Sequence, residues 1–399
     1  MTATPIGARP ERPGARRAGM VGLWRNAALR GAVQQVAIVV LVVGGLGYFA
    51  WNASDALQRQ GVAGGFGYLS QEAGFAIGES PIGFEPSHTY LRAFVVGLLN
   101  TLKVSALAIV GATVVGVIVG LMRLSPNWGL AKLAQAYVEI FRNTPQLLQM
   151  ILWYWIMTRL PGPRAAYEPL PGLFLSNRGI QLPWLADDPG WPAVVVGTIA
   201  LAALAIAAAV AIRRRWRGHR LPLGLPGSLV LVPAAGALIL WLAVGAPSAI
   251  DWPALRGLNF RGGVTFSPEF TALFLALSLY IAAFVAEIVR SGIQSLGRGQ
   301  IDAGRSLGLS RGQIIRLILI PQALRVMIPP LAAQYVSLVK NSSLAVAIGY
   351  PDVVNVSNTM LVQSGHVVEA IAMMSAVYLV ISLVIAVLMN WFNRSIQLK

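Results

Sequence analysis

Two polar clusters interrupt otherwise apolar stretches of this sequence, and their residue types could bind a small charged solute. The first cluster contains Glu139, Arg142, Asn143, Thr144, Pro145 and Gln146. The second contains Lys340, Asn341, Ser342 and Ser343. The second cluster offers ammonium, amide and hydroxyl groups, which suit a solute with both a carboxylate and an ammonium group. Polar side chains inside membrane helices are costly, so each cluster is a candidate functional site.

The first cluster has two interpretations. Glu139 and Arg142 lie three residues apart on one helix face and can pair. Pro145 has no N–H, so the carbonyl of Phe141 loses its helical partner. The pattern predicts either a broken helix that lines a translocation path or its gate, or a structural ion pair near the membrane boundary.

Other polar residues in apolar runs favour structural roles. Asn100 and Thr101 are more typical of interhelical hydrogen bonds than of a solute site. Glu287 and Arg290 can pair at i,i+3, as a brace for the loop that follows them.

The composition gives little support for a metal site, a bound cofactor or a catalytic nucleophile. There is no cysteine, and the three histidines, His88, His219 and His366, lie far apart in the chain. None of the lysines follows the glycine spacing of a Walker A loop, and no Ser/His/Asp or paired-carboxylate arrangement is recognisable. We therefore expect no metal site, no cofactor bound by this chain and no ATPase activity.

The elements that position these residues are membrane spans. Hydrophobic residues make up 56% of the chain and charged residues 12%, against about 25% charged in a soluble domain. A bilayer core of about 30 Å needs about 20 apolar helical residues, and about eight runs qualify. They cover residues 33–51, 93–121, 133–157, 193–212, 227–244, 267–288, 330–346 and 366–391. None alternates like a barrel strand, so we predict an all-α polytopic membrane protein.

Charge distribution predicts the orientation. The chain has 31 Lys and Arg against 15 Asp and Glu, a formal net charge of +16. With the N-terminus inside, most basic residues fall in inside segments and most acidic residues in outside loops, as the positive-inside rule requires. Both termini are therefore expected in the cytoplasm. The excess charge records orientation in a lipid bilayer rather than affinity for nucleic acid, and the Arg-rich stretch at 213–220 is most simply an orientation signal.

Composition divides the chain into segments. Residues 1–32 form a basic cytoplasmic tail, 33–52 the first transmembrane anchor and 53–90 a Gly-rich periplasmic loop. Residues 91–157 and 267–394 hold both polar clusters, and the resemblance described below implies that they are the two parts of a permease core. Between them, 158–266 is expected to be an insertion of two extra transmembrane helices with Pro-containing outside loops.

The inside segment 290–321 is too long for a simple connector. Ala303 and Leu307 recur at helical spacing, Gly308 can end that turn, and Ser310 with Gln313 is typical of a capping box. Pro321 is expected to stop the second helix. The pattern predicts either a cytoplasmic knob that another protein can grip or an interfacial helix lying on lipid.

This loop resembles the EAA-type loop of ABC importer permeases. Asp302, Ala303, Gly304 and Gly308, followed by Ile318, Ile320 and Pro321, fit its spacing without a gap. Asp302, Gly304 and Ile320 depart from the Glu, Ala and Leu of that pattern. Five segments are similar to the permeases for polar amino acids, in the same order: 97–121, 137–149, 281–293, 299–310 and 338–349. The long outside loop and the insertion resemble the long permease subunit of the general L-amino acid importers of proteobacteria.

The resemblance implies a type I ABC importer permease fold in the bacterial inner membrane. It also implies an ATPase-coupling loop that includes Gln300, Asp302, Ala303, Gly304, Gly308 and Pro321. The expected partners are a second, unlike permease, two cytoplasmic ATPase subunits that hold ATP and Mg, and a periplasmic amino acid binding protein. A secondary transporter working without an ATPase is the main alternative. A receptor or scaffold anchor is a third, although it would not need polar clusters inside spans.

Overall fold

The computed structural model describes residues 64–396, apart from 187, 189, 216–224 and 246–248, together with single positions between 33 and 55. The chain divides into a smaller unit, residues 1–68 with 360–372, and a larger unit, residues 69–359 with 373–399. The predicted tail at 1–32 and much of the predicted first span at 33–51 lie outside the described residues. The functional clusters all belong to the larger unit.

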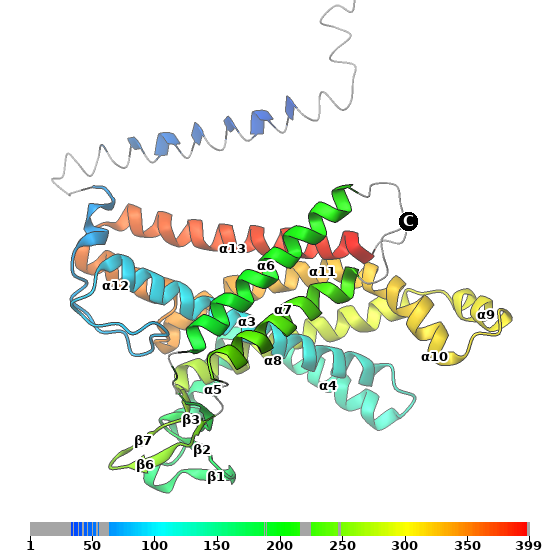
Figure 1. Cartoon of the computed structure of the whole chain (residues 1–399), viewed down its shortest axis with the longest axis horizontal. Coiled ribbons are helices and arrows are strands. Elements are labelled where there is room, and N and C mark those ends of the chain that lie inside the picture. Colours follow the sequence, from blue (N-terminus) through cyan, green and yellow to red (C-terminus); the bar gives the residue numbers. More distant parts are fainter. Residues whose placement is uncertain are drawn as a thin grey trace, which may run out of the picture. The chain divides into compact units, whose positions relative to one another are not determined.

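Two long helices, α3 (Tyr90–Arg123) and α8 (Pro268–Gln294), pack closely against each other (Figure 1). Small residues of α3 make this approach possible. A Cβ on Gly116 would lie 2.5 Å from the Cβ of Val285, and one on Gly120 would lie 2.8 Å from the carbonyl oxygen of Ala286. Membrane helices associate through such small residues because close van der Waals contact replaces the hydrophobic effect there.

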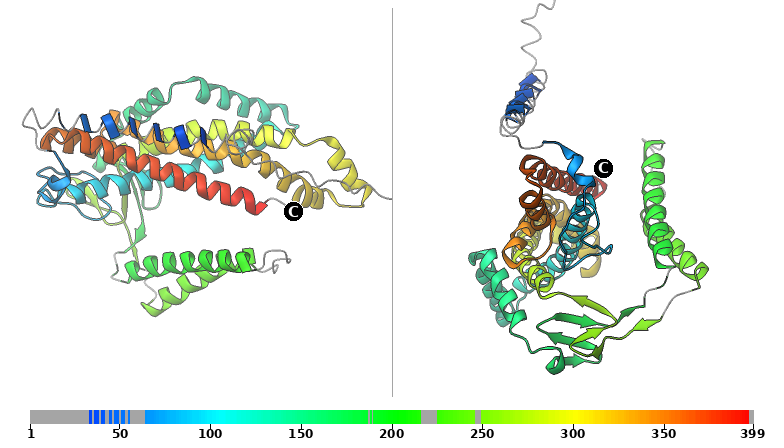
Figure 2. Two further views of the ribbon diagram at one scale, coloured as in Figure 1. Left: turned by 90° about the horizontal axis from the view of Figure 1, so that it is seen from above. Right: turned by 90° about the vertical axis from the view of Figure 1, so that its left-hand side faces the viewer.

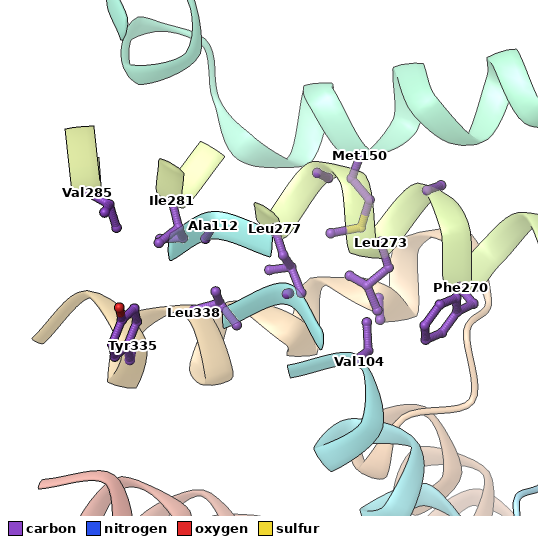
Figure 3. Packing of buried hydrophobic residues seen from close by; sticks show 14 of the residues in the cluster. Val104, Ala112, Met150, Phe270, Leu273, Leu277, Ile281, Val285, Tyr335 and Leu338 are labelled. Atoms are coloured by element: carbon purple, nitrogen blue, oxygen red, sulfur yellow. The ribbon is translucent and has the colours of Figure 1, made fainter. Parts of the chain in front are cut away.

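One apolar core joins α3, α8, α5 (Gln146–Thr158) and α11 (Ile320–Asn341). Figure 3 shows its members, among them Val104, Met150, Leu273, Leu277 and Leu338, all fully buried. The core fixes the start of α5 and the end of α11, where the two polar clusters lie.

The third predicted span, residues 133–157, is two helices rather than one. Helix α4 (Trp128–Asn143) begins at an N-cap, where the Asn127 side chain accepts a hydrogen bond from the N–H of Leu130 at 3.2 Å. It ends before Thr144 and Pro145, both extended, and α5 begins at Gln146. The break expected from Pro145 is therefore present.

The all-α expectation is wrong for the insertion, which also contains short strands. The strands β1 (Tyr167–Leu170), β2 (Leu173–Ser176), β3 (Gly179–Leu182) and β8 (Val264–Phe266) form an antiparallel sheet in the order β1-β2-β3-β8. Ile180 pairs with Phe266 across a gap of 86 positions, so the sheet joins the two ends of the insertion. The strands β4 (Trp184–Leu185) and β5 (Ile250–Asp251) pair with each other, as do β6 (Ala254–Arg256) and β7 (Asn259–Arg261). A short 3-10 helix, η2 (Pro163–Ala165), precedes β1. Strands of two to four residues are too short to show a period-two pattern in the sequence.

Between these strands, α6 (Trp191–Arg215) and α7 (Leu225–Ala243) form a helical pair and match the fourth and fifth predicted spans (Figure 2). Glycines again allow the two helices to approach closely. A Cβ on Gly197 would lie 2.4 Å from Leu240, and one on Gly236 would lie 2.1 Å from Leu201. Their uninterrupted apolar stretches among the described residues, Ala193–Ala205 and Leu231–Ala243, are shorter than a full span.

After α8 come α9 (Arg298–Ser306) and a single helical stretch, Arg311–Ile348. That stretch consists of α10 (Arg311–Gln313), the π-helix η3 (Ile314–Leu319), α11 and the 3-10 helix η4 (Ser342–Ile348). The prediction that Pro321 stops the helix is wrong. The N–H of Ile320 donates to the carbonyl of Ile315, so a wider π turn precedes the proline and the helix continues through it.

The helices α12 (Val353–Ser364) and α13 (Val367–Ile396) complete the chain, with the 3-10 helix η1 (Phe66–Ser70) before α3. Among the described residues, four helical stretches are long and apolar enough to cross a membrane: Tyr90–Arg123, Pro268–Gln294, Arg311–Ile348 and Val367–Asn393. The helical, multi-span class is confirmed. The other four of the eight predicted spans are the first, the broken third and the shorter pair in the insertion.

Candidate translocation path and coupling loop

The break between α4 and α5 is stabilised by a buried amide. The side chain of Gln149 donates through Nε2 to the carbonyl of Phe141 at 2.9 Å and to that of Thr144 at 3.0 Å. Pro145 has no N–H to donate to the carbonyl of Phe141, so the amide of Gln149 replaces the missing helical bond. Sequence reasoning did not single out Gln149, although an amide one turn after a proline was a usable signal.

The two predicted polar clusters meet in the structure. Asn341, the last residue of α11, donates from Nδ2 to Oε1 of Gln146, the first residue of α5, at 2.7 Å. Gln146 is buried, and its Nε2 has no hydrogen-bond partner among the described residues. A buried donor without a partner is costly, which marks a place where another group can bind.

The predicted pair between Glu139 and Arg142 is not formed. The carboxylate of Glu139 accepts a hydrogen bond from Nε2 of Gln135 at 2.8 Å, one turn earlier on the helix. The guanidinium of Arg142 lies over the ring of Phe284, 5.1 Å from its centroid. Glu139, Arg142 and Asn143 are all exposed in this chain. The interpretation as a structural ion pair is therefore wrong, because each side chain has a different neighbour.

Hydroxyl groups of the second cluster bind their own helix. Ser342 donates to the carbonyl of Val339, and Ser343 donates to that of Lys340, both at 2.7 Å. These bonds satisfy carbonyls at the end of α11, where the helix tightens into η4. The ammonium of Lys340 is exposed and makes no ion pair with any residue the structure describes.

The predicted knob is present at the end of the larger unit that lies opposite its strands (Figure 1). Helix α9 ends at Ser306, and Gly308 makes the turn that follows it, with a φ of +74° that is favourable for glycine. Ser310 and Gln313 form the expected capping box at the start of α10. Gly304 is buried against η3, and a Cβ there would lie 2.9 Å from Ile314. This close approach explains glycine at a position where the similar loops have alanine.

The remaining loop residues are on the surface of the knob. Asp302 pairs with Arg305 at 3.7 Å, and both side chains are about 70% exposed. Ala303 is exposed as well, and Leu307 at the tip is 78% exposed. Gln300 accepts a hydrogen bond from Gln322 at 3.1 Å, which ties α9 to the start of α11 beside Pro321.

A brace links the end of α8, which leads into the knob, to the end of α3. Glu287 pairs with Arg290 as expected, and Arg290 Nε donates to its Oε2 at 3.1 Å. Arg123, at the end of α3, pairs with the same carboxylate. Sequence reasoning missed Arg123 because the two helices are far apart in the chain and only their packing brings the groups together.

Asn100 and Thr101 make the bonds between segments that were expected of them. Asn100 Nδ2 donates to the carbonyls of Glu79 at 2.8 Å and Pro351 at 2.9 Å. The hydroxyl of Thr101 accepts from the N–H of Val353 at 2.9 Å. Both side chains are fully buried and hold α3 against the segment that leads into α12.

Comparison with known proteins is consistent with this arrangement. Residues 221–398 match a family described as the inner membrane component of binding-protein-dependent transport systems. The chain is 47% identical over 382 residues to the putative amino-acid ABC transporter permease protein YhdX of Escherichia coli (strain K12), covering 94% of this chain and 96% of that protein. It is 41% identical over 374 residues to the general L-amino acid transport system permease protein AapQ of Rhizobium johnstonii, with 92% of each covered.

A third relative is the glutamate/glutamine/aspartate/asparagine transport system permease protein BztB of Rhodobacter capsulatus, 36% identical over 400 residues, with 92% of this chain and 93% of that protein covered. All three matches extend across nearly the whole of both proteins. On that similarity, the chain belongs to the family of amino-acid ABC transporter permeases, as an inner-membrane transport subunit rather than an enzyme.

Proposed function

We propose that this permease moves polar L-amino acids across the inner membrane, driven by ATP hydrolysis on partner subunits. The observation that carries the proposal is the hydrogen bond of 2.7 Å between Asn341 and Gln146, which joins the helix break to the end of α11. The unpartnered Nε2 of Gln146 suits a solute carboxylate. The names of the relatives, which include a general L-amino acid permease and a permease for four polar amino acids, support this class of solute.

The path lies, in this proposal, between this chain and a second permease subunit. Arg142, Asn143 and Lys340 are exposed in the isolated chain, although charged groups at membrane depth should face a cavity or a partner. A heterodimer would enclose these residues, together with Glu139, Thr144 and Pro145, in a polar passage. Ser342 and Ser343 then shape the helix end rather than bind solute.

Coupling to ATP hydrolysis would pass through the knob. We infer that Gln300, Asp302, Ala303 and Gly308 present its surface to an ATPase subunit and that Gly304 holds it against η3. The continuous helical stretch through Pro321 would carry its movement to Asn341, because a packed helix moves as a rigid element. Two ATPase subunits would hold ATP and Mg, and a periplasmic binding protein would deliver the solute.

The proposed topology has both termini in the cytoplasm, eight spans and a type I importer fold. Segments 91–157 and 267–394 are the two parts of the permease core, with a coupling loop at 290–321. The insertion at 158–266 adds two spans and carries its strands on the periplasmic side. The predominance of basic residues in the segments assigned to the cytoplasm supports this orientation.

Reconstitution tests the proposal. The full chain would be co-purified with its partner permease, ATPase and binding protein, and uptake of labelled L-glutamine into proteoliposomes measured with ATP and with a non-hydrolysable analogue. We expect uptake only with ATP, and a lower rate for Gln146→Leu than for the matched variant Gln363→Leu, which changes an exposed amide on α12 that takes no part in the contact between Gln146 and Asn341. Equal uptake without ATP would contradict the proposal and favour a secondary transporter.

A further inference from the structure

A carboxylate is held at the start of α8 by groups from two helices. Lys103 of α3 places its Nζ 2.6 Å from Oε1 of Glu79. Ser267, the N-cap residue of α8, donates its hydroxyl to Oε2 of Glu79 at 2.7 Å. Both oxygens of the carboxylate are therefore bound, and the Glu79 side chain is only 17% exposed.

The groups around this carboxylate are held in place by contacts of their own. The ammonium of Lys103 lies 4.7 Å from the ring centroid of Phe270 and 5.8 Å from that of Phe266, which fixes it by cation–π contact. The Ser267 hydroxyl also accepts the N–H of Phe270 at 3.0 Å, at the positive end of a helix of 27 residues. An ammonium, a hydroxyl and a helix start together favour an anionic group.

Glu79 reaches this site from a separate segment, residues 71–85, which we call the strap. The strap contains turns and bends rather than a helix, and it crosses positive φ at Gly74 and Gly83. Asn100 holds the carbonyl of Glu79, and backbone bonds from Ala73 and Gly74 hold the strap to residues 86–88. Segments with few regular hydrogen bonds open at lower free energy than packed helices.

A cavity of about 370 Å³ adjoins the bound carboxylate. Its polar lining comes from Glu79, Ser267, Glu269, Asn355 and Thr359, and no Lys or Arg lines it. Glu269 is half-buried, and its Oε1 accepts the hydroxyl of Tyr154 at 3.1 Å. This volume lies within the range of small-molecule pockets, and a carboxylate on its wall suits an ammonium group.

We propose that Lys103, Ser267 and Glu269 form a second amino acid binding site, in which the Glu79 side chain holds the carboxylate position until a solute displaces it. The α-carboxylate of the solute would bind Lys103 and Ser267, and its ammonium would face Glu269. Exchange of one carboxylate for another leaves Lys103 paired, so the displacement avoids a buried unpaired charge. The inference rests on the proposed function, because it assumes that amino acids reach this subunit.

The test is equilibrium binding of labelled L-glutamine to the purified full complex without the binding protein. Glu79→Gln removes the competing carboxylate, so we expect the Kd to fall about threefold to tenfold. Glu72→Gln, an exposed carboxylate on the same strap, is the matched control and should leave the Kd unchanged. Ser267→Ala should raise the Kd, whereas Ser267→Thr keeps the hydroxyl and should bind like the unaltered complex.

A second ligand separates site competition from simple opening of the strap. Glutamine α-amide has no carboxylate, so its binding should not improve in Glu79→Gln. An equal gain for the amide, or an unchanged Kd for L-glutamine, would overturn the inference. ATP-driven uptake by the unaltered complex is measured in parallel: if it is present while the Kd does not respond to Glu79 or Ser267, the second site fails and the proposed function stands. Absence of ATP-driven uptake would contradict the proposed function itself.

Discussion

Pro145 and Pro321 each lie within an apolar helical region of the sequence, yet the chain responds to them in opposite ways. At Pro145 the helix breaks, with two extended residues between α4 and α5. At Pro321 the helix continues for more than twenty residues, to the end of η4. The two regions differ in how the backbone carbonyls near each proline find hydrogen-bond donors.

At the break, a side chain from the following helix takes over the backbone bonds, because Gln149 binds the carbonyls of Phe141 and Thr144. Before Pro321, the π turns of η3 shift the hydrogen-bond pattern by one residue, so that the backbone itself absorbs the proline. A proline in a membrane helix therefore does not determine a break by itself. The outcome depends on whether a polar side chain or a local change of helix type compensates the missing bond.

The largest expected effect comes from the turn that leads into the continuous stretch. Gly308→Val places a β-branched residue at a φ of +74°, at a cost on the order of 1–2 kcal/mol that the loop would avoid by moving the knob. We expect ATP-driven uptake to fall about tenfold or more, the kinetic equivalent of roughly 1.4 kcal/mol, while the complex still co-purifies. Uptake and co-purification are measured on the same preparation.

Gly308→Asn is the control for that experiment, because asparagine tolerates the left-handed region. It should retain most of the uptake. Normal uptake in Gly308→Val would contradict the role of the knob in coupling.

Removal of the compensating amide at the break should have the next largest effect. Gln149→Leu leaves the carbonyls of Phe141 and Thr144 without their side-chain donor, which we expect to lower the free energy of unfolding by about 1–3 kcal/mol. The midpoint of thermal unfolding in mild detergent reports the change. The comparison is Gln135→Leu on α4, a less buried amide, expected within about 0.5 kcal/mol of the unaltered chain. Equal midpoints for the two variants would mean that the break does not depend on Gln149.

The bond between the two regions can be measured with a double-mutant cycle. Gln146→Ala, Asn341→Ala and the double variant should give a coupling of about 0.6 kcal/mol, typical of hydrogen bonds between membrane helices. The free energies come from the same unfolding measurement. Strict additivity of the two single changes would show that the hydrogen bond between Asn341 and Gln146 contributes nothing to stability, which would leave it only a role in the solute path.

The smallest effect is expected at Pro321. Because η3 already accommodates the proline, Pro321→Ala should change the free energy of unfolding by no more than about 0.5 kcal/mol and leave uptake intact. Pro145→Ala is its counterpart, since the added N–H would compete with Gln149 for the carbonyl of Phe141. A larger loss of uptake in Pro321→Ala than in Pro145→Ala would reverse the comparison on which these predictions rest.

Local signals in the sequence were reliable where the physics is local. The capping box of Ser310 and Gln313, the turn at Gly308 and the pairing of Glu287 with Arg290 each involve residues within a few positions of one another. The prediction for Pro321 failed because a π turn before the proline lets the helix continue. The predicted pair of Glu139 with Arg142 failed because Glu139 binds Gln135 of the same helix, whereas Arg142 lies over Phe284 of another helix. The strands of the insertion were missed because each is too short to show a pattern.

The sequence by itself determined that this is a multi-span membrane permease with a loop resembling that of ABC importers, since long apolar runs and motif spacing are properties of the chain alone. Only the tertiary structure decided which polar groups meet. Asn341 and Gln146 are 195 positions apart, and Ser267 and Glu79 are 188 apart. Such pairs depend on the close packing of α3, α5, α8 and α11, and a polar group buried in that packing needs a partner wherever the fold supplies one.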